Sequence, residues 1–592
     1  MAATEISNHY AIPKTKLNYT RSIHKYERTH TTNMLTGYIY PLGFINAMPG
    51  DTLPNKFGFI LQSAPLLGPC LDNIYIDIIS VWCPTRLVFA QHNQWLGDND
   101  TLAWTIPNDA SSALPKLTKM LLGCDSNMNS FSRAYYAEHY RAPHYGLRYF
   151  NKNAQTIFSG SNPIVGSESV FSKGIQVIPW RMYDEIWNKL FRNENIQAPQ
   201  LYSKASGTDL SLDVSHYFEG GGHLLRACRL KNIFTMARIA PSIQMVDVLA
   251  GVNAPVVTPS TDTKILFGMY KESSGSRGTF VDNSSMQLNT GSSNLQGSSS
   301  AIPGGGSSAY AYTTNLIADL SSLTVNNLYY SIMLQRYFNK ASTGRRPAEF
   351  YHEFFGVDSS LVGADDPQLL SQKRFKVNIS RVVSTANSTD AQGSLQGLGT
   401  QGAFSLTSVG GTLFPAFTAT EYGMLHVFAV IRTQESISSG IDKYLADDTL
   451  LTTYLPVFDH IGDEAIERLE LADATTNNAT RVFGYNSAWY RYRYFMNDVV
   501  GILSPSEPLG YMTMAREFLA GSITGVNSDF IEQSPLEFDR LLQFPVFYNP
   551  SGVDCDDEGE PYESNRYQWL IQFALAGDFA RTMSKDSEQL TF

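Results

Sequence analysis

Alternation of apolar and polar positions predicts β-strands along much of the chain. In Arg374–Ser380 every second side chain is apolar, which is typical of a strand with one buried face. Gly423–Arg432 and Tyr567–Leu575 repeat this period of two. Ile74–Cys83 is largely apolar at both sets of alternating positions, which predicts a strand covered on both faces. Because these strands lie far apart in the sequence, their pairings must be long-range. The pattern favours a mainly β sandwich with large insertions.

Helical periodicity is sparse by comparison. Arg181–Arg192 follows Pro179 and carries its large apolar side chains on one stripe, with acidic residues near its start and basic residues near its end. Both features are typical of an amphipathic helix that complements its own dipole. A longer helix is predicted over Ser322–Lys340 and a short one over Pro347–Phe355.

Two stretches, Glu272–Tyr312 and Ser384–Gly411, are dominated by serine, glycine and polar residues. Such a composition cannot bury enough apolar surface to form a core, so both are predicted to be surface excursions. We expect a Ser/Gly-rich surface loop at about 258–313 and a second loop at about 384–411.

The first 31 residues are polar, lack a regular period and contain Pro13, which predicts an extended N-terminal arm. The arm is either a solvated tail tied down by its neighbours or a segment that faces nucleic acid. Five basic residues against Glu5 and Glu27 give it a charge of +3. The candidate nucleic-acid-binding residues are Lys14, Lys16, Arg21, Lys25 and Arg28.

Composition narrows the class of protein. The 592 residues carry a formal net charge of −11, only 17 % are charged, and 12 % are aromatic. Low charge with many aromatic side chains suits large contact surfaces, and it excludes global disorder and a uniformly basic nucleic-acid coat. The five cysteines are scattered, which fits neither a disulfide framework nor a zinc ribbon. The beginning of the sequence does not resemble a signal peptide, and no stretch of about 18 apolar residues predicts a membrane span.

Templates for catalysis and metal binding match poorly. The sequence has no nucleophile elbow, phosphate loop or HExxH zinc motif. His139 with His144, and His216 with His223 and Cys228, are too loosely spaced to indicate a metal site. The run that contains Asp554, Asp556 and Glu558 matches the first half of a calcium loop, but Asn565 stands where such a loop needs a glutamate. These three carboxylates form a candidate cation site, and an exposed acidic loop is the favoured interpretation.

Two runs combine cations with aromatic rings, Arg21–Arg28 and Tyr490–Tyr494. Such mixtures suit single-stranded nucleic acid, because rings stack on bases and cations meet phosphates. As a strand, Tyr490–Tyr494 would place its two arginines on one face and its three tyrosines on the other. A strand with a tyrosine-packed face is an equally good interpretation.

Several segments occur together in a recognisable order. Ile178-Pro-Trp-Arg181-Met-Tyr183 leads into Ile186-Trp187-Asn188. Before it stand Met48-Pro-Gly-Asp-Thr52 and Val81-Trp-Cys-Pro84-Thr-Arg86-Leu87, and after it come Gly344-Arg345-Arg346 and Phe483-Gly484-Tyr485. In this order they resemble the major capsid protein of the Microviridae, the small icosahedral single-stranded DNA phages, and most of all its gokushovirus branch. The resemblance spans about residues 20–583, and Thr235–Gln244 departs from the family pattern, which implies a divergent lineage.

The resemblance implies an eight-stranded antiparallel jelly-roll sandwich with long, partly helical interstrand insertions. On this interpretation residues 1–31 are the arm and residues 32–592 are a single jelly-roll capsid domain. It implies a non-enzymatic protein without cofactors, of which sixty copies form a T=1 shell around circular single-stranded DNA. The implied partners are other copies of the chain, the packaged DNA, a small basic DNA-condensing protein, a DNA pilot protein and a host cell surface receptor. The implied location is the virion, assembled in the host cytoplasm.

A second hypothesis from another class is a carbohydrate-binding or carbohydrate-active β-sandwich protein, since sandwiches with aromatic loops often hold sugars. A glycosidase would need two carboxylates flanking a cleft, which the sequence alone does not pair. Electron microscopy discriminates between the two, because only the capsid hypothesis predicts uniform shells.

Overall fold

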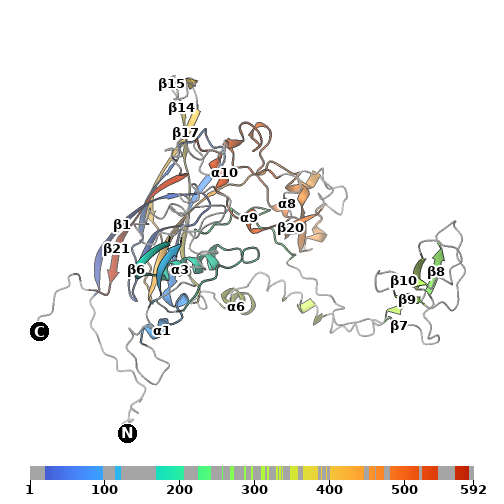
Figure 1. The fold of residues 1–592 in the computed structure, drawn as a ribbon, viewed down its shortest axis with the longest axis horizontal. Coiled ribbons are helices and arrows are strands. Elements are labelled where there is room, and N and C mark those ends of the chain that lie inside the picture. Colours follow the sequence, from blue (N-terminus) through green and yellow to red (C-terminus); the bar gives the residue numbers. More distant parts are fainter. Residues whose placement is uncertain are drawn as a thin grey trace, which may run out of the picture. The chain divides into compact units, whose positions relative to one another are not determined.

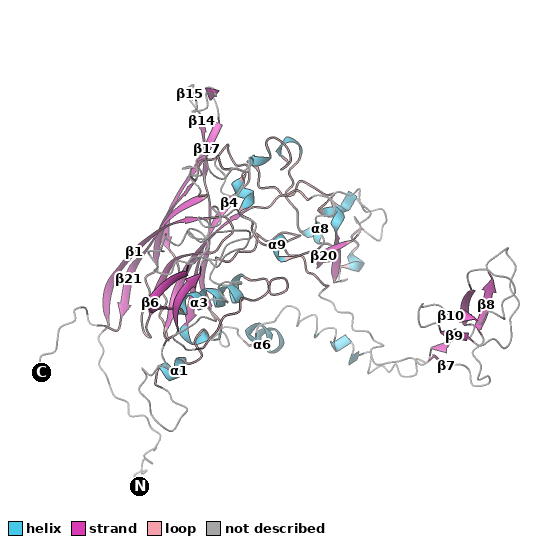
Figure 2. Ribbon diagram, in the orientation of Figure 1, coloured by secondary structure: helices cyan, strands magenta, loops and turns pink. Residues whose placement is uncertain are grey.

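The fold is mainly β, with short helices between the strands (Figure 1; Figure 2). The chain divides into two compact units, Met1–Pro241 with Val357–Phe592, and Ser242–Gly356. The computed structural model describes residues 21–97, 114–121, 168–205, 224–241, 347–357, 365–383, 401–445, 453–459, 462–472, 481–518, 525–543 and 567–583, and shorter pieces at 256–257, 267–271, 286–288, 295–297, 309–313, 317–318, 329–330, 332–334, 337, 388–389, 395–396, 523 and 585.

The first unit contains a five-stranded antiparallel sheet. Its strand order is β1-β21-β3-β17-β14, so the first and the last of the described strands are neighbours. Burial alternates along β3, where Phe57, Phe59 and Leu61 point into the core and the residues between them point outward. The bounds are β1 Ser22–Met34, β21 Trp569–Arg581, β3 Lys56–Ser63, β17 Gln401–Thr412 and β14 Ile379–Val383.

A four-stranded antiparallel sheet packs against it, in the order β13-β4-β18-β2. Phe375 of this sheet lies with its ring centroid 5.5 Å from that of Phe59 in the other, so the aromatic core fills the space between the sheets. The central strands β4 and β18 are buried on both faces, which confirms the prediction for Ile74–Cys83. The bounds are β13 Gln368–Lys376, β4 Ile74–Pro84, β18 Gly423–Thr433 and β2 Tyr40–Ala47.

Helix α3 (Ile178–Ile186) covers the second face of this sheet and continues into a π-helical turn, Trp187–Phe191. The rings of Tyr183 and Phe191 meet Phe428 of β18 edge-on, at centroid distances of 5.8 Å and 6.0 Å. The predicted helix over Arg181–Arg192 is confirmed, although it begins earlier because Pro179 occupies its first turn, where a missing N–H costs nothing.

A smaller core of the same unit lies around the hairpin of β19 (Asp463–Glu467) and β20 (Val482–Ser487). The remaining helices of this unit are short: α1 His92–Trp95, α8 Tyr490–Arg493, α9 Ser528–Ile531, α10 Leu536–Asp539, and 3-10 turns at Thr85–Leu87, Lys443–Leu445, Pro456–Phe458, Arg468–Glu470, Gly501–Leu503 and Gly510–Met512. Two further strand pairs are β5 (Lys116–Leu121) with β6 (Glu168–Gln176), and β15 (Ser388–Thr389) with β16 (Leu395–Gln396). No helix in the described ranges is long and apolar enough to cross a bilayer.

The second unit contains three nested antiparallel strand pairs in the stretch predicted as a Ser/Gly-rich loop. They are β7 (Val256–Val257) with β12 (Ile317–Ala318), β8 (Phe267–Lys271) with β11 (Ala309–Thr313), and β9 (Met286–Leu288) with β10 (Leu295–Gly297). Helix α6 spans Pro347–Phe355, as predicted. Within Ser322–Lys340 the described positions, at 329–330, 332–334 and 337, are helical.

The second predicted loop, at 384–411, differs from the structure over 401–411, which belong to β17. Ala403, Ser405 and Thr407 form the buried face of this part of β17, and their small side chains give no apolar pattern in the sequence. The Ser405 hydroxyl donates to the Asn378 carbonyl (2.8 Å), so its burial leaves no unpaired hydroxyl proton. The predicted boundary of the N-terminal arm at residue 31 falls inside β1.

Candidate nucleic-acid interface

A cavity of about 1240 Å³ opens beside the four-stranded sheet in the first unit. Its walls are residues of β4, β13 and the end of β18, the end of the π-helical turn, the segment 228–236, and the segment that follows α8. Six basic side chains and one acidic side chain line it: Arg192, Arg229, Lys231, Arg374, Arg432, Arg493 and Glu435. Most charged side chains of the lining are therefore basic, and its other side chains are uncharged.

On the sheet side, two guanidinium groups share one carboxylate. Asp77 of β4 is fully buried and accepts hydrogen bonds from Arg374 Nε (2.7 Å) and Nη2 (3.0 Å) on β13 and from Arg432 Nη1 (3.0 Å) on β18. These bonds raise the pKa of Arg374, although its partial burial opposes the change. Two positive charges against one negative charge leave this wall with a net charge of +1.

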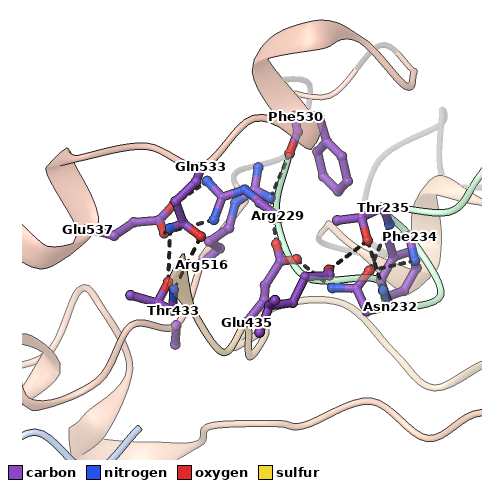
Figure 3. A network of polar contacts seen from close by, with 12 residues as sticks. Arg229, Asn232, Phe234, Thr235, Thr433, Glu435, Arg516, Phe530, Gln533 and Glu537 are labelled. Carbon is purple, nitrogen blue, oxygen red and sulfur yellow. Dashed lines mark hydrogen bonds and ion pairs between the residues drawn. The ribbon is translucent and has the colours of Figure 1, made fainter. Parts of the chain in front are cut away.

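A second network fixes Arg229, another residue of the lining (Figure 3). Arg229 donates to both oxygens of Glu537, with Nη1 at 2.8 Å from Oε2, and Gln533 Nε2 donates to the same Oε2 at 2.9 Å. Burial acts to lower the pKa of Arg229, but the charge of Glu537 outweighs it, so the pKa lies above its usual value. A bidentate pair of this kind holds the guanidinium in one orientation.

Glu435, the acidic residue of the lining, is already engaged by the same network. Its Oε1 accepts from Arg516 Nη1 at 2.5 Å, and its Oε2 accepts from Asn232 Nδ2. Asn232 in turn accepts backbone N–H bonds from Phe234 (3.0 Å) and Thr235 (2.7 Å), which fixes the turn at this wall (Figure 3). A glycosidase site needs two carboxylates facing a substrate, and this lining offers one that is bonded on both oxygens.

The rim of the cavity carries exposed cations and rings. Lys231 is exposed, and Arg493 lies 3.3 Å from Asp459 in an exposed ion pair. Tyr494 and Phe495 follow directly in the chain and line the same opening. Cations that reach phosphates next to rings that stack on bases are the combination that binds single-stranded nucleic acid.

The structure describes only part of the predicted basic arm, since Lys14 and Lys16 lie outside the described residues. Arg21, just before β1, donates from Nη2 to the Thr52 hydroxyl at 2.7 Å. Thr52 follows the turn after β2, where Gly50 adopts a φ of 89°. Arg21 is therefore held at one end of the five-stranded sheet.

Within β1 the basic residues separate onto two faces. Lys25 lies on the exposed face and pairs with Asp578 of β21. Arg28 lies on the half-buried face, with its guanidinium carbon 4.5 Å from the centroid of the Phe44 ring. On that face, burial and the charge of Arg28 lower the pKa of His30. The period of two in a strand explains this separation, because residues 25 and 28 differ by an odd number of positions.

The run Tyr490–Tyr494 is not a strand, so the predicted alternation of its faces is wrong. Tyr490–Arg493 is a single helical turn, α8, that follows Trp489 in the left-handed region (φ 62°). Tyr490 is buried and its hydroxyl donates to Glu470 (2.6 Å to Oε1). Arg493 and Tyr494 nevertheless reach the cavity, as their cation-and-ring composition indicates.

The other candidate positions carry no metal site in the described part of the chain. Asp554, Asp556 and Glu558 lie outside the described residues, as do His139, His144, His216 and His223. Cys228 lines the cavity with its sulfur 3.5 Å from Gln197 Oε1, and burial raises the pKa of its thiol. Among the described residues no three His, Cys, Asp or Glu side chains come together in a way that could hold a metal ion.

The sequence did not reveal the buried ion pairs that shape the cavity. Arg374 and Asp77 are 297 residues apart, and Arg229 and Glu537 are 308 residues apart. The one available signal was the clean alternation of Arg374–Ser380, which places Arg374 on the face away from the sandwich core.

Comparison with known proteins supports the predicted resemblance. The family model described as capsid protein (F protein) of phages matches residues 161–551. Capsid protein VP1 of Bdellovibrio phage phiMH2K is 24 % identical over 527 residues, which cover 86 % of this chain and 87 % of that protein. Capsid protein VP1 of Spiroplasma virus 4 is 23 % identical over 545 residues (88 % and 89 %), and that of Chlamydia phage 1 is 23 % identical over 585 residues (88 % and 90 %).

All three relatives are capsid proteins of Microviridae, which confirms the resemblance read from the sequence motifs. The family is structural by kind, so no catalytic site is needed to account for the chain. The family model covers well over half of the sequence. The chain therefore belongs to the capsid protein (F protein) family of phages.

Proposed function

We propose that this protein is the major capsid protein of a Microviridae phage, that sixty copies form a T=1 icosahedral shell, and that the shell encloses circular single-stranded DNA. The observation that carries the proposal is the strand order. The two large sheets contain β14 and eight longer strands, β1, β2, β3, β4, β13, β17, β18 and β21; numbered along the chain, these eight run 1-8-3-6 in one sheet and 5-4-7-2 in the other.

This order is the one that two interlocked Greek keys produce when a chain folds into an eight-stranded jelly roll, an architecture of viral capsid domains. β14 adds a short ninth strand at the edge of the first sheet. The α3 segment and the other helices lie in connections between these strands, as the partly helical insertions of the resembled family imply.

Packaging requires a local source of positive charge. With a net charge of −11, the average field of the protein repels DNA, so phosphates must meet a basic patch or a separate basic peptide. We assign this role to the cationic cavity and to the arm bearing Lys14, Lys16, Arg21, Lys25 and Arg28, supplemented by a small basic DNA-condensing protein. Binding to phosphates and stacking on bases give affinity without sequence readout.

The remaining partners follow from the same proposal. A DNA pilot protein shares the virion, the shell assembles in the host cytoplasm, and the stretch at about 258–313 is an outward excursion that meets the host cell surface receptor. A weak cation site at Asp554, Asp556 and Glu558 stays a prediction. The alternative function, a carbohydrate-binding β-sandwich, gains no support from the lining of the cavity.

The test begins with electron microscopy of the expressed protein and of phage particles. We expect uniform shells, and DNA retention that falls as salt rises. Replacing Lys231 and Arg493 with Gln, and in a second variant Lys14, Lys16 and Arg21 with Gln, should lower the salt slope of DNA retention. The expected decrease is roughly 0.7 for each phosphate that the variant no longer neutralises.

Lys56→Gln, which removes one exposed positive charge on β3 in the other sheet, is the control and should leave the slope unchanged. Monomers that bind sugars and never form shells would overturn the capsid proposal. Shells whose DNA retention has the same salt dependence in both variants would overturn the assignment of the cavity and arm.

A further inference from the structure

The five-stranded sheet ends in a short strand, β14, whose outer edge is open. β14 pairs with β17 on one side, and no described strand pairs with its other side. Val383 pairs with Gln401, and farther along Ser388 pairs with Gln396. Ser388 lies five residues after Val383, and Gln396 lies five residues before Gln401. The pair β15 and β16 therefore has the same register as the pair β14 and β17. Figure 1 shows β14 and β15 beyond β17 at one end of the sandwich.

The base of this two-stranded ribbon is firmly anchored. Ala403 and Ser405 of β17 are buried, and the Ser405 N–H donates to the Ser63 hydroxyl at 2.9 Å. Leu66 N–H donates to the Ala403 carbonyl at 3.0 Å, which ties the chain after β3 to the same point. The paired strands β14 and β17 are therefore fixed to the sandwich at this point.

The outward face beside this edge carries a continuous apolar stripe. Four large apolar side chains on three neighbouring strands form it, and their exposed fractions are 44 % for Ile60, 53 % for Leu406, 38 % for Phe404 and 51 % for Val382. Leu406 and Phe404 are two residues apart on β17, Ile60 lies diagonally across from Leu406 on β3, and Val382 lies diagonally across from Phe404 on β14. Diagonal neighbours on one face lie within reach of long side chains.

This edge strand carries one charged residue, Arg381, whereas the edge strands β13 and β1 each carry three. Edge strands are usually blunted by charges or proline, because an open edge pairs with other chains. The edge strand β13 carries Lys373, Arg374 and Lys376, and β1 carries Lys25 and Arg28. From Ile379 to Ser405 the sequence has two charged residues of opposite sign, Arg381 and Asp390. An open edge that carries a single charge beside an apolar stripe is suited to pairing.

We infer that the open edge of β14, the ribbon beyond it and the apolar stripe form an interface with a second copy of this chain. The inference rests on the proposed assembly of many copies into a shell. The described parts of this interface are the five residues of β14, about 17 Å long at roughly 3.4 Å per residue, the short pair of β15 and β16, and the four side chains of the stripe beside them.

A two-stranded ribbon on its own is marginally stable in water, so packing against a second copy would also stabilise the ribbon itself. The interior of a protein interface is poor in charge, as this stretch is. A surface of this low charge fits a protein partner. In the proposed shell, the most numerous protein is another copy of this chain.

Hydrogen exchange tests the inference on assembled shells and on unassembled protein from the same preparation. Amides of Ile379–Val383 and of Gln401–Ser408 should exchange at least tenfold more slowly in the shell, and amides of the central strand β4 should be protected in both states. Equal exchange of the ribbon in both states would overturn the inference, as would full protection in the unassembled protein, because the same chain would then cover the surface.

Substitution gives a second readout. Val382→Lys with Leu406→Lys should reduce the yield of shells at least tenfold, while the unassembled protein keeps its melting temperature. Ile23→Lys, an exposed change of the same kind on β1 at the opposite edge of the sheet, is the matched control and should assemble normally. Equal yields from all variants, or equal loss from all, would overturn the inference. Failure of the unaltered protein to form shells would instead overturn the proposed function.

Discussion

The buried charges beside the cavity are paired, and strand register and turns fix these pairs. Asp77 takes two guanidinium groups from the strands on either side of it, and Arg229 takes Glu537 in a bidentate pair. Burying a charge is unfavourable, and attraction compensates only when the geometry is good and the remaining polar atoms are bonded. The buried pairs therefore chiefly hold their side chains in one orientation. Removing one partner of a pair leaves the other charge buried and uncompensated.

Glu537→Gln should destabilise the protein by about 3–5 kcal/mol, because the buried Arg229 loses its counter-charge. Urea unfolding of the unassembled protein measures the change. Arg493→Gln, which removes one partner of an exposed pair, should change stability by no more than about 0.5 kcal/mol. Similar losses in both variants would contradict the role given to the buried pair.

Asp184 in α3 should make the protein less stable as pH rises. It is buried, its Oδ2 accepts no hydrogen bond from the described residues, and burial followed by the charge of Glu185 raises its pKa well above the usual value. A folded-state pKa above the unfolded value means that stability is fully present below about pH 4 and is lost as pH rises toward the folded pKa.

Asp184→Asn should accordingly raise the free energy of unfolding at pH 7 and leave it nearly unchanged at about pH 3.5, below the usual carboxyl pKa. Denaturant unfolding of both proteins across this pH range gives the comparison. A variant that is less stable than the parent at pH 7 would show that the carboxylate is ionised and paired in the folded protein.

Two helices and one misread segment show which sequence signals were sufficient to predict secondary structure. Helices α3 and α6 were predictable because their apolar positions recur with the helical period and a proline marks each start. Tyr490–Tyr494 was misread because strict alternation over five residues suits a strand, whereas Trp489 in a left-handed conformation starts a helical turn there. Local pattern cannot reveal such a backbone reversal, nor the distant ion pairs that make the cavity.

Helix α3 also explains why its run of residues is recognisable as a family motif. The Tyr183 hydroxyl donates to the Ile39 carbonyl (2.8 Å) and accepts from the Leu225 N–H (2.9 Å), while Trp187 Nε1 donates to the Arg226 carbonyl (3.0 Å). These side chains satisfy backbone groups of segments that are not in regular structure. The motif therefore joins loops to the helix that covers the sheet.

Tyr183→Phe should cost about 1–3 kcal/mol, since it leaves a buried carbonyl and a buried N–H without their partner. Thermal unfolding measures it, and Tyr444→Phe, at an exposed tyrosine in the first unit, is the matched control. A variant with unchanged melting temperature would mean that water replaces the hydroxyl.

At the scale of the whole molecule, the chain separates a large sandwich from a unit that lies between β6 and β13 in the sequence. Its nested strand pairs were not predictable, because serine and glycine give almost no pattern over 258–313 and the pairs are two to five residues long. The dispersed strands of the sandwich were predictable, since each buries a clear apolar face. Their order in the sheets was not, because it depends on pairings across hundreds of residues.

Deletion of Gly275–Ser308 should leave shell assembly intact and reduce adsorption to host cells. Lys271 pairs with Ala309, so the deletion leaves Glu272–Ser274 as a three-residue connection between β8 and β11, a common hairpin length. Shell yield by sedimentation and adsorption by plaque assay measure the two effects. A flexible Gly/Ser linker of the original length is the control, and loss of all soluble shells would contradict the prediction.

The neighbouring positions of β1 and β21 also govern how the protein is made. β21 lies between β1 and β3 in its sheet, yet about 500 residues separate it from β3 in the sequence. At about 5–20 residues per second, synthesis of that stretch takes roughly 25–100 s, during which β1 lacks the neighbour that it has in the finished sheet. Nascent chains must therefore wait in an incomplete state, and a chain that terminates before residue 569 never closes the sheet. The strand order thus makes β21 necessary for covering the inner edges of both β1 and β3.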